Sequence, residues 1–293
     1  IVAIGEEAKK MMGRVHKELN TIRPMRDGVI ADFEIAEGML KEFIKKITSG
    51  FMPAKRIVIC VPSGITEVEK RAVRDTAEKA GAKEVFLISE PMAAAIGIGL
   101  DVTAPFGNMI IDIGGGTTEI AVIALSGITN GVSIRVAGDE LTEAIIRFFR
   151  ANQNMLIGET TAENIKCQVG SVMPLEEEII IEVKGRDLVA GVPKLTEVSS
   201  IEIREALNAP VQQMVEAVKV ALEKTAPELS SDILDRGIFL TGGGALLQGL
   251  DERIRVETGV PVHVAEEPLT AVARGTGKVL EDINKYRKVL LSR

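Results

Sequence analysis

The 293-residue sequence has no tryptophan, one tyrosine and 3% aromatic residues, so its core must be built from aliphatic side chains and methionine. Its two cysteines, Cys60 and Cys167, stand far apart, without the spacing of a zinc site or a disulfide framework, which is typical of a reducing cytoplasm. Lys plus Arg number 35 against 42 Asp plus Glu, and this mild acidity argues against a nucleic-acid binder. No apolar run reaches the length of a transmembrane helix.

Short β-rich runs alternate with helical stretches along the chain, which predicts an α/β fold. A chain of this length is also longer than one hydrophobic core usually supports, so we expect two lobes. Continuous apolar runs or runs rich in β-branched residues predict strands at Ile57–Val61, Val85–Ile88, Met109–Ile113 and Ile238–Thr241.

Helix starts are predicted from capping signals and prolines. Thr66 with Glu69 and Thr160 with Glu163 have the spacing of capping boxes, and Asp139 is expected to cap a third helix. A long helix is expected to start at Pro210. Between 174 and 200 we expect a β-hairpin whose turn is formed by residues 184–187.

The most specific motif is a glycine run after the strand Met109–Ile113, in which Asp112 is followed by Gly114, Gly115, Gly116 and Thr117. A second strand follows at once, so the run forms the turn of a hairpin and differs from a dinucleotide-binding GxGxxG turn, which opens a helix. Glycines allow backbone N–H groups to close on a phosphate, Asp112 is placed to hold Mg²⁺ through waters, and Thr117 can bond a phosphate or a water. The alternative is a plain tight hairpin.

A second glycine turn, Gly242, Gly243, Gly244 and Ala245, follows the strand that ends at Thr241 and precedes a predicted helix at 245–254. Such a turn lets a nucleotide base or sugar approach the backbone closely. Alone it is equally consistent with an ordinary strand-to-helix connection.

Three further charged residues are candidates for the same site. Glu163 and Lys166 lie three apart on one predicted helix and could bracket a ribose and base, although a solvated ion pair explains them as well. Glu90 lies between a strand and a helix, where it could orient or deprotonate a water. Alternatively, its negative charge simply interacts favourably with the helix dipole.

The motifs together resemble the MreB-type bacterial actins, within the superfamily of actin, sugar kinases and heat-shock chaperone ATPases. The resemblance covers nearly the whole chain and rests on IRPMRDGVIADFE (22–34), VPSGIT (61–66), EPMAAAIG (90–97), DIGGGTTE (112–119), AGDELTEAI (137–145), IGETTAENIK (157–166), LTGGGALLQGL (240–250) and PLTAVARGTGK (268–278). It implies an actin-like α/β fold, made of duplicated ribonuclease-H-like lobes with four subdomains around a nucleotide cleft. The subdomains are expected at 1–34 (IB), 35–104 with 276–293 (IA), 105–140 with 205–275 (IIA) and 141–204 (IIB).

The resemblance also implies roles for the candidate residues in binding ATP with Mg²⁺. Gly114–Thr117 correspond to the second phosphate loop, Glu163 and Lys166 to the nucleoside-contacting pair, and Gly242–Ala245 to the adenosine motif. Glu90 and Thr117 correspond to the pair that supports slow ATP hydrolysis. The family's first phosphate loop, which takes part in ATP binding and hydrolysis, has no counterpart in this sequence, and the family pattern suggests that about forty residues are absent.

Proteins of this family polymerise into double protofilaments at the inner face of the cytoplasmic membrane, where they guide the cell-wall elongation machinery and maintain rod shape. The adjacent apolar residues Phe51 and Met52 are the expected membrane-attachment loop, unless they pack into the first lobe. A small-molecule kinase, a chaperone-type ATPase domain and a non-hydrolysing scaffold are the alternatives.

Overall fold

The computed structural model describes residues 1–47 and 56–291, so the predicted membrane loop with Phe51 and Met52 lies outside the described residues. Its α-helices are α1 (Glu6–Met11), α2 (Phe33–Ile47), α3 (Glu67–Lys79), α4 (Glu90–Gly97), α5 (Gly138–Asn152), α6 (Glu159–Val169), α7 (Ser200–Glu223), α8 (Pro227–Arg236), α9 (Leu250–Thr258) and α10 (Ala271–Glu281). Short 3₁₀ helices are η1 (Gly243–Leu246), η2 (Pro268–Thr270) and η3 (Arg287–Val289). The strands are β1 (Met25–Arg26), β2 (Val29–Ile30), β3 (Arg56–Val61), β4 (Glu84–Ser89), β5 (Asn108–Ile113), β6 (Thr118–Ala124), β7 (Gly127–Ile134), β8 (Met155–Leu156), β9 (Ile180–Asp187), β10 (Pro193–Ser199), β11 (Ile238–Thr241) and β12 (Val262–Val264).

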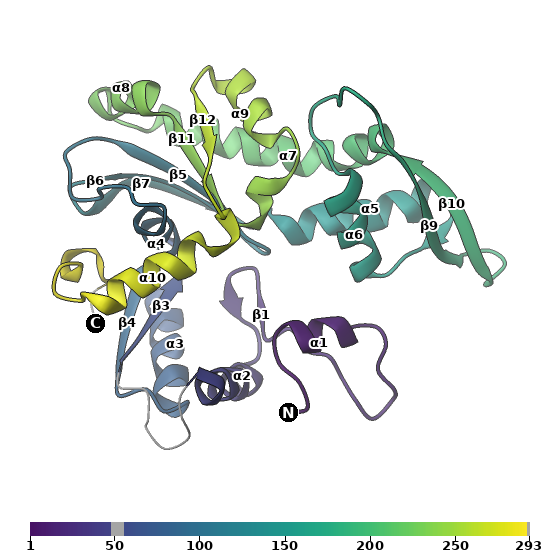
Figure 1. The fold of residues 1–293 in the computed structure, drawn as a ribbon, viewed down its shortest axis with the longest axis horizontal. Helices are drawn as coiled ribbons and strands as arrows, with labels where there is room; N and C mark the ends of the chain where they lie inside the picture. Colours follow the sequence, from purple (N-terminus) through teal and green to yellow (C-terminus); the bar gives the residue numbers. More distant parts are fainter. Residues whose placement is uncertain (48–55, 292–293) are drawn as a thin grey trace.

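A five-stranded sheet with the order β12-β11-β5-β6-β7 forms the centre of the second lobe (Figure 1). Strand β5 pairs in parallel with β11 and antiparallel with β6. Every residue of β5 and β6 is buried, because both faces of the sheet are covered by helices. Since β5 and β11 run in the same direction, their carboxyl ends meet at one edge of the sheet.

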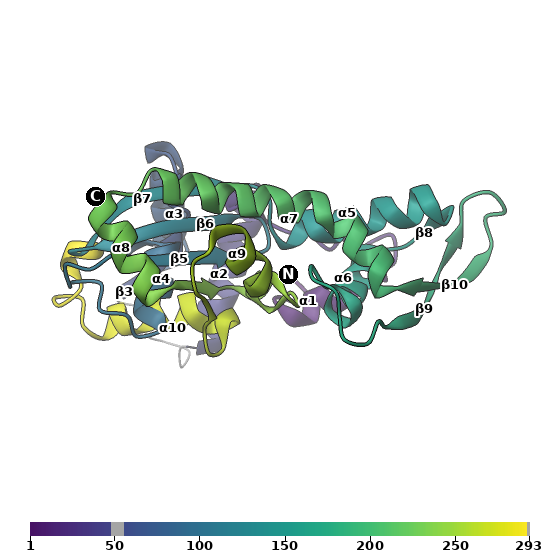
Figure 2. The ribbon, with the colours of Figure 1, turned by 90° about the horizontal axis from the view of Figure 1, so that it is seen from above.

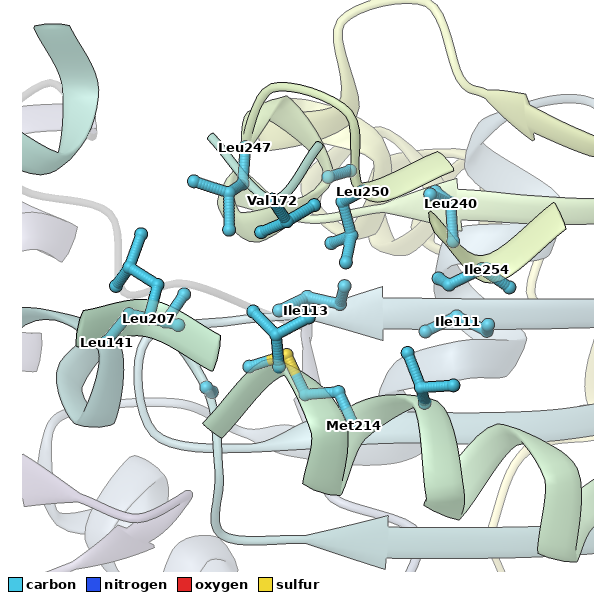
Figure 3. Packing of buried hydrophobic residues seen from close by; sticks show 14 of the residues in the cluster. Ile111, Ile113, Leu141, Val172, Leu207, Met214, Leu240, Leu247, Leu250 and Ile254 are labelled. Carbon is cyan, nitrogen blue, oxygen red and sulfur yellow. The ribbon is translucent and has the colours of Figure 1, made fainter. Parts of the chain in front are cut away.

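The two faces of this sheet belong to two different hydrophobic cores. Met109, Ile111 and Ile113 pack into the larger core with helices α7 and α9. Figure 3 shows Ile113 between Leu250 and Met214. Ile110 of β5, with Ala121 and Ile123 of β6, faces the opposite side of the sheet. These residues join the second core, which is formed with α4 and α10. Side chains alternate along a strand, so Asp112 faces the same side as Ile110, toward the first lobe.

The first lobe contains the parallel pair β3–β4, with α2 and α3 packed beside it. Helices α4 and α10 cross between this pair and the central sheet at two glycines, Gly97 and Gly275. A Cβ atom built on Gly97 would lie 1.8 Å from the Ala271 carbonyl oxygen, and one on Gly275 equally close to that of Ala93. The Lys278 ammonium donates to the last carbonyls of α4, which fixes the crossing further.

Helices α5 and α6 and the antiparallel strands β8, β9 and β10 form the far end of the second lobe. Helix α7 runs from this end across β6 and β7, and Figure 2 shows it along the upper surface of the molecule. Among the described residues, no helix is long and apolar enough to cross a membrane.

Several local predictions are confirmed. The four predicted strands correspond to β3, β4, β5 and β11, and the glycine run after β5 is the turn of the β5–β6 hairpin. The capping box of Thr66 and Glu69 is formed at the start of α3, with both reciprocal hydrogen bonds present.

One predicted turn and one predicted helix start are wrong. Strand β9 continues through residues 184–187, and the hairpin turn is formed by 188–192 instead. Helix α7 begins at Ser200, where Ser199 and Glu202 form a capping box, and Pro210 lies inside the helix. The proline is tolerated because Leu207, Val211 and Met214 anchor the helix in the larger core.

The predicted helix after the second glycine turn is divided in two. Residues 243–246 form the 3₁₀ helix η1, and α9 begins at Leu250 after the left-handed Gly249. Glycine suits position 249, because a residue with a side chain would be strained at a φ near 79°.

Candidate functional site

The two glycine turns lie side by side at the edge of the central sheet where β5 and β11 end. Asp112 and Thr241 are register partners, and the Thr241 hydroxyl donates a 2.8 Å hydrogen bond to the Asp112 carboxylate. A Cβ atom on Gly242 would lie 2.3 Å from the Ile113 carbonyl oxygen, and one on Gly244 would lie 2.2 Å from the Ile113 side chain. Glycine is therefore required in the second turn by its contact with the first.

The first glycine turn is held from within and leaves donors available. The Gly114 N–H donates to the Thr117 carbonyl oxygen at 2.9 Å, which closes the turn. Within residues 1–47 and 56–291, no hydrogen bond engages the N–H groups of Gly115 and Gly116. A Cβ on Gly115 would meet only the Asp139 carboxylate, at an ordinary 3.6 Å, so packing alone does not require glycine there. Free backbone N–H groups in a turn are the donors that an anion needs.

Three carboxylates lie on the side of the sheet that faces the first lobe. Asp112 and Glu119 are buried register partners on β5 and β6, and Glu90 is the first residue of α4. Burial and the charges of Asp112 and Glu119 raise the pKa of Glu90 to about 8. Burial raises the pKa of Asp112 to about 6, against the opposing effect of the Thr241 hydrogen bond.

Glu119 was not predicted as a site residue, yet it joins the two lobes. Its carboxylate accepts hydrogen bonds from the Ser63 N–H at 3.0 Å and from the Ser63 hydroxyl, in the loop after β3. It also accepts from the Ser133 hydroxyl of β7 at 2.5 Å. The local sequence gave no signal for this, because both partners are distant in the chain.

An apolar cavity of about 220 Å³ lies beside Glu90 in the first lobe. It is lined by strand β3, helices α2 and α3 and the β1–β2 hairpin, with Cys60 and Glu90 in its wall. These apolar surroundings explain why Glu90 is desolvated. Thr117, at the end of the first glycine turn, is buried against the turn of the β1–β2 hairpin, where a Cβ on Gly28 would lie 3.0 Å from its methyl group.

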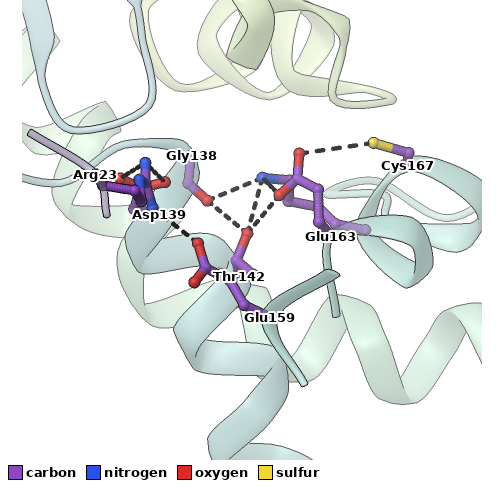
Figure 4. Close-up of polar contacts among 8 residues, drawn as sticks. Arg23, Gly138, Asp139, Thr142, Glu159, Glu163 and Cys167 are labelled. Atoms are coloured by element: carbon purple, nitrogen blue, oxygen red, sulfur yellow. Dashed lines mark hydrogen bonds and ion pairs between the residues drawn. The ribbon is translucent and has the colours of Figure 1, made fainter. Parts of the chain in front are cut away.

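Glu163 and Lys166 of α6 form the predicted ion pair at 2.7 Å, and Lys166 is largely buried. The Lys166 ammonium also donates to the Gly138 carbonyl at 2.9 Å and to the Thr142 hydroxyl at 3.0 Å, both in α5 (Figure 4). Burial opposes ionisation of Glu163, but hydrogen bonds from Lys166 and Thr142 outweigh it and lower its pKa. The pair is therefore held against α5 and is not simply a solvated ion pair.

Two predicted capping roles at this end of the site are wrong. Helix α6 begins after its N-cap Gly158 without a side-chain cap, because Thr160 lies inside the helix, and the Glu163 carboxylate is bound by Thr142 and Lys166 instead. Helix α5 begins at Gly138, and the Asp139 side chain binds Arg23.

Asp112 is the candidate ligand for a cation at this edge. Among the described residues, no group of three or more His, Cys, Asp or Glu side chains is placed to hold a metal ion. A single carboxylate suits Mg²⁺, which keeps several waters and takes other ligands from phosphate oxygens.

Comparison with known proteins assigns this arrangement to a family. The family model for MreB/Mbl protein matches residues 1–288. The chain belongs to the MreB/Mbl family. This MreB/Mbl chain is 54% identical over 294 residues to the cell shape-determining protein MreB of Escherichia coli strain K12, covering 100% of the chain and 85% of that protein. It is 48% identical to the cell shape-determining protein Mbl of Bacillus subtilis strain 168, covering 100% and 88%.

Solved structures show that this MreB/Mbl chain has the actin-like fold that the sequence predicts. The crystal structure of MreB5 of Spiroplasma citri bound to ADP superposes with a TM-score of 0.92 at 36% identity, covering 98% of this chain and 87% of that one. A MamK double helical filament matches with a TM-score of 0.79 at 22% identity, covering 96% and 85%, and supports the fold alone.

Proposed function

We propose that this chain is an ATP-binding cytoskeletal protein whose filaments determine rod cell shape and direct cell-wall synthesis. The observation that carries the proposal is the meeting of the two glycine turns, joined by the Thr241–Asp112 hydrogen bond, at one edge of the central sheet. In open α/β sheets, ligands bind at the carboxyl ends of the strands.

The residues around this edge fit a nucleotide. The free N–H groups of Gly115 and Gly116 suit phosphate oxygens, Gly242–Ala245 suit the adenosine, and Glu163 with Lys166 suit the nucleoside from the α6 side. Asp112 would hold Mg²⁺ through waters, and Mg²⁺ when bound would neutralise phosphate charge. The E. coli and B. subtilis relatives are named cell shape-determining proteins, and MreB5 of Spiroplasma citri was solved with ADP and with AMPPNP.

Slow ATP hydrolysis is part of the proposal, with Glu90 and Thr117 positioning the attacking water. Glu90 carries its proton at neutral pH in the ligand-free protein, because its pKa is about 8. In that form its hydroxyl can donate a hydrogen bond to a water and its carbonyl oxygen can accept one, which suits the positioning of a water.

The proposed partners are further copies of the chain in double protofilaments, the inner face of the cytoplasmic membrane and the cell-wall elongation machinery. Family membership supports self-association. The membrane contact is proposed for Phe51 and Met52. The division into four subdomains, with boundaries near 34, 104, 140, 204 and 275, is likewise proposed.

The test is nucleotide binding followed by assembly. The chain should bind a fluorescent ATP analogue with Mg²⁺ and sediment when ATP is added, with phospholipid vesicles increasing the pelleted fraction.

The variant Gly115→Ala should keep its thermal stability but bind the analogue at least tenfold more weakly, because its methyl group occupies space beside the phosphate donors. Asp112→Asn should lose the Mg²⁺ dependence of binding. A well-folded chain that binds no nucleotide would overturn the ATP proposal, and one that binds it but stays monomeric would overturn the filament.

A further inference from the structure

Arg23 carries a charged connection between the two lobes that lies outside every glycine motif. Its Nη1 lies 2.8 Å from a Glu159 carboxylate oxygen, and its Nη2 donates to both Asp139 oxygens, at 2.8 and 3.1 Å (Figure 4). Asp139 is in the first turn of α5 and Glu159 is the first residue of α6. One guanidinium therefore binds the starts of both helices, with the planar fork geometry that suits arginine better than lysine.

The segment that holds Arg23 is packed on the first lobe. The β1–β2 hairpin follows Arg23 directly and lines the cavity wall with β3 and α3. At its turn, a Cβ on Gly28 would lie 2.8 Å from the Pro62 ring, in the loop after β3. The same turn touches the second lobe, since a Cβ on Gly116 would lie 2.8 Å from the backbone of Asp27. The hairpin is thus in contact with the glycine turn while Arg23 extends to α5 and α6.

The carboxylates that bind Arg23 are rigidly connected to the proposed nucleotide site. The Gly138 and Asp139 N–H groups donate to the Gly114 and Gly115 carbonyls, at 3.1 and 2.7 Å. On the other side, the Lys166 ammonium donates to the Gly138 carbonyl at 2.9 Å. A movement of the glycine turn therefore displaces Asp139, and with it the partner of Arg23.

We propose that Arg23 is an ionic clamp that holds the two lobes closed over the glycine turn and so slows the release of bound nucleotide. Arg23 is a positioning residue in this scheme, because its contacts are with Asp139 and Glu159. The three side chains are 38–47% exposed, so each ion pair shifts the open–closed equilibrium modestly. Half-exposed pairs are worth about two- to fivefold each, which predicts a combined effect of about five- to twentyfold.

The clamp itself is tested without nucleotide, so the result does not depend on the proposed function. Spin labels at exposed Asp75 of α3 and Glu182 of β9, after substitution of both by cysteine, report the distance between the lobes by pulsed electron paramagnetic resonance. Exposed Cys167 is replaced by serine, and Cys60 stays unlabelled because burial raises the pKa of its thiol to about 12. Arg23→Glu should broaden the distance distribution toward longer values.

Matched variants separate the clamp from a general charge effect. Arg26→Glu makes the same charge change on exposed Arg26 of β1, which has no ion pair among the described residues, and should leave the distances unchanged. Arg23→Glu with Asp139→Arg should restore the short distances by reversing the pair. If Arg23→Glu and Arg26→Glu give the same distribution as the unsubstituted chain, the clamp is overturned.

The consequence for nucleotide is measured separately, as the dissociation rate of a fluorescent ATP analogue with Mg²⁺. Arg23→Glu should release it about five- to twentyfold faster than Arg26→Glu, and the Arg23→Glu, Asp139→Arg variant should return toward the original rate. Equal release rates together with altered lobe distances would refute the link to nucleotide retention. Absence of binding by every variant would count against the proposed function and leave the distance result standing.

Discussion

The hydroxyl of Thr241 and the carboxylate of Asp112 are 129 residues apart in the chain and 2.8 Å apart in the fold. Both residues are buried, at the ends of neighbouring parallel strands. This hydrogen bond fixes the position of the proposed Mg²⁺-binding carboxylate relative to the second glycine turn.

Replacing Thr241 by valine keeps the side-chain shape and removes the donor. Asp112 would then be buried without that partner, and we expect the free energy of unfolding to fall by about 1–3 kcal/mol in chemical denaturation. Thr241→Ser keeps the hydroxyl and should lose less. Equal stability of the valine variant and the original chain would show that water replaces the bond.

Gly97 and Gly275 should each be intolerant of alanine. The added Cβ would lie 1.8 Å from a backbone oxygen of the facing helix, so α4 and α10 must separate, at a cost of about 3 kcal/mol or more. Gly277 offers the control, because it lies in the same helix α10 with no atom near its Cβ position. Gly277→Ala should stabilise the chain by about 1 kcal/mol through helix propensity. Thermal unfolding of the three variants measures this, and similar melting temperatures would refute the close crossing.

Glu90 should make the ligand-free chain less stable as the pH rises. Its pKa is about 8 in the folded chain against an ordinary 4.5, so between these values the folded state holds a proton that the unfolded state has lost. The stabilising contribution is fully present below pH 4.5 and declines as the pH rises through 8. Asp112, with a pKa of about 6, contributes in the same direction over a lower range.

Glu90→Gln removes the titrating group and should flatten this dependence. The glutamine variant should be more stable than the original at pH 9 by on the order of a few kcal/mol, and close to it at pH 5. Denaturant titrations from pH 5 to 9 measure the difference. A stability difference that does not change with pH would mean that Glu90 is ionised throughout.

Thr142 should support the Glu163–Lys166 pair from α5. Thr142→Val removes the hydroxyl that contacts both side chains and should cost about 1–2 kcal/mol of stability. If the pair binds a nucleoside, the same variant should also weaken binding of an ATP analogue, whereas Thr142→Ser should do neither. Thermal unfolding measures the stability and calorimetric titration measures the affinity for the analogue. If Thr142→Val changes neither, the Thr142 hydroxyl does not support the ion pair.

The fold could be predicted where local signals agree with the tertiary structure. Continuous apolar runs gave β5 and β11, and the glycine runs marked the turns after them. The capping box forms at Thr66 because Thr66 is the N-cap of α3, whereas Thr160 has the same spacing from Glu163 but lies inside α6, where Glu163 binds Lys166 and Thr142.

The charged part of the site could not be predicted in the same way. Asp139 has the sequence context of a helix cap, and its actual partner, Arg23, lies 116 residues earlier in the chain. Glu119 is bound by Ser63 from the other lobe, 56 residues away. Such pairings depend on how the lobes pack, and no local pattern records them.

The parallel pairing of β5 with β11 also has a consequence for folding. The chain between these strands includes α5, α6 and α7, so their pairing closes a long loop and should form late. Until it forms, Asp112 and the second glycine turn belong to separate pieces of chain, and a ligand that needs both has nothing to bind. Such a ligand would therefore bind only the folded chain. It would raise the free energy of unfolding, by an amount that grows with ligand concentration.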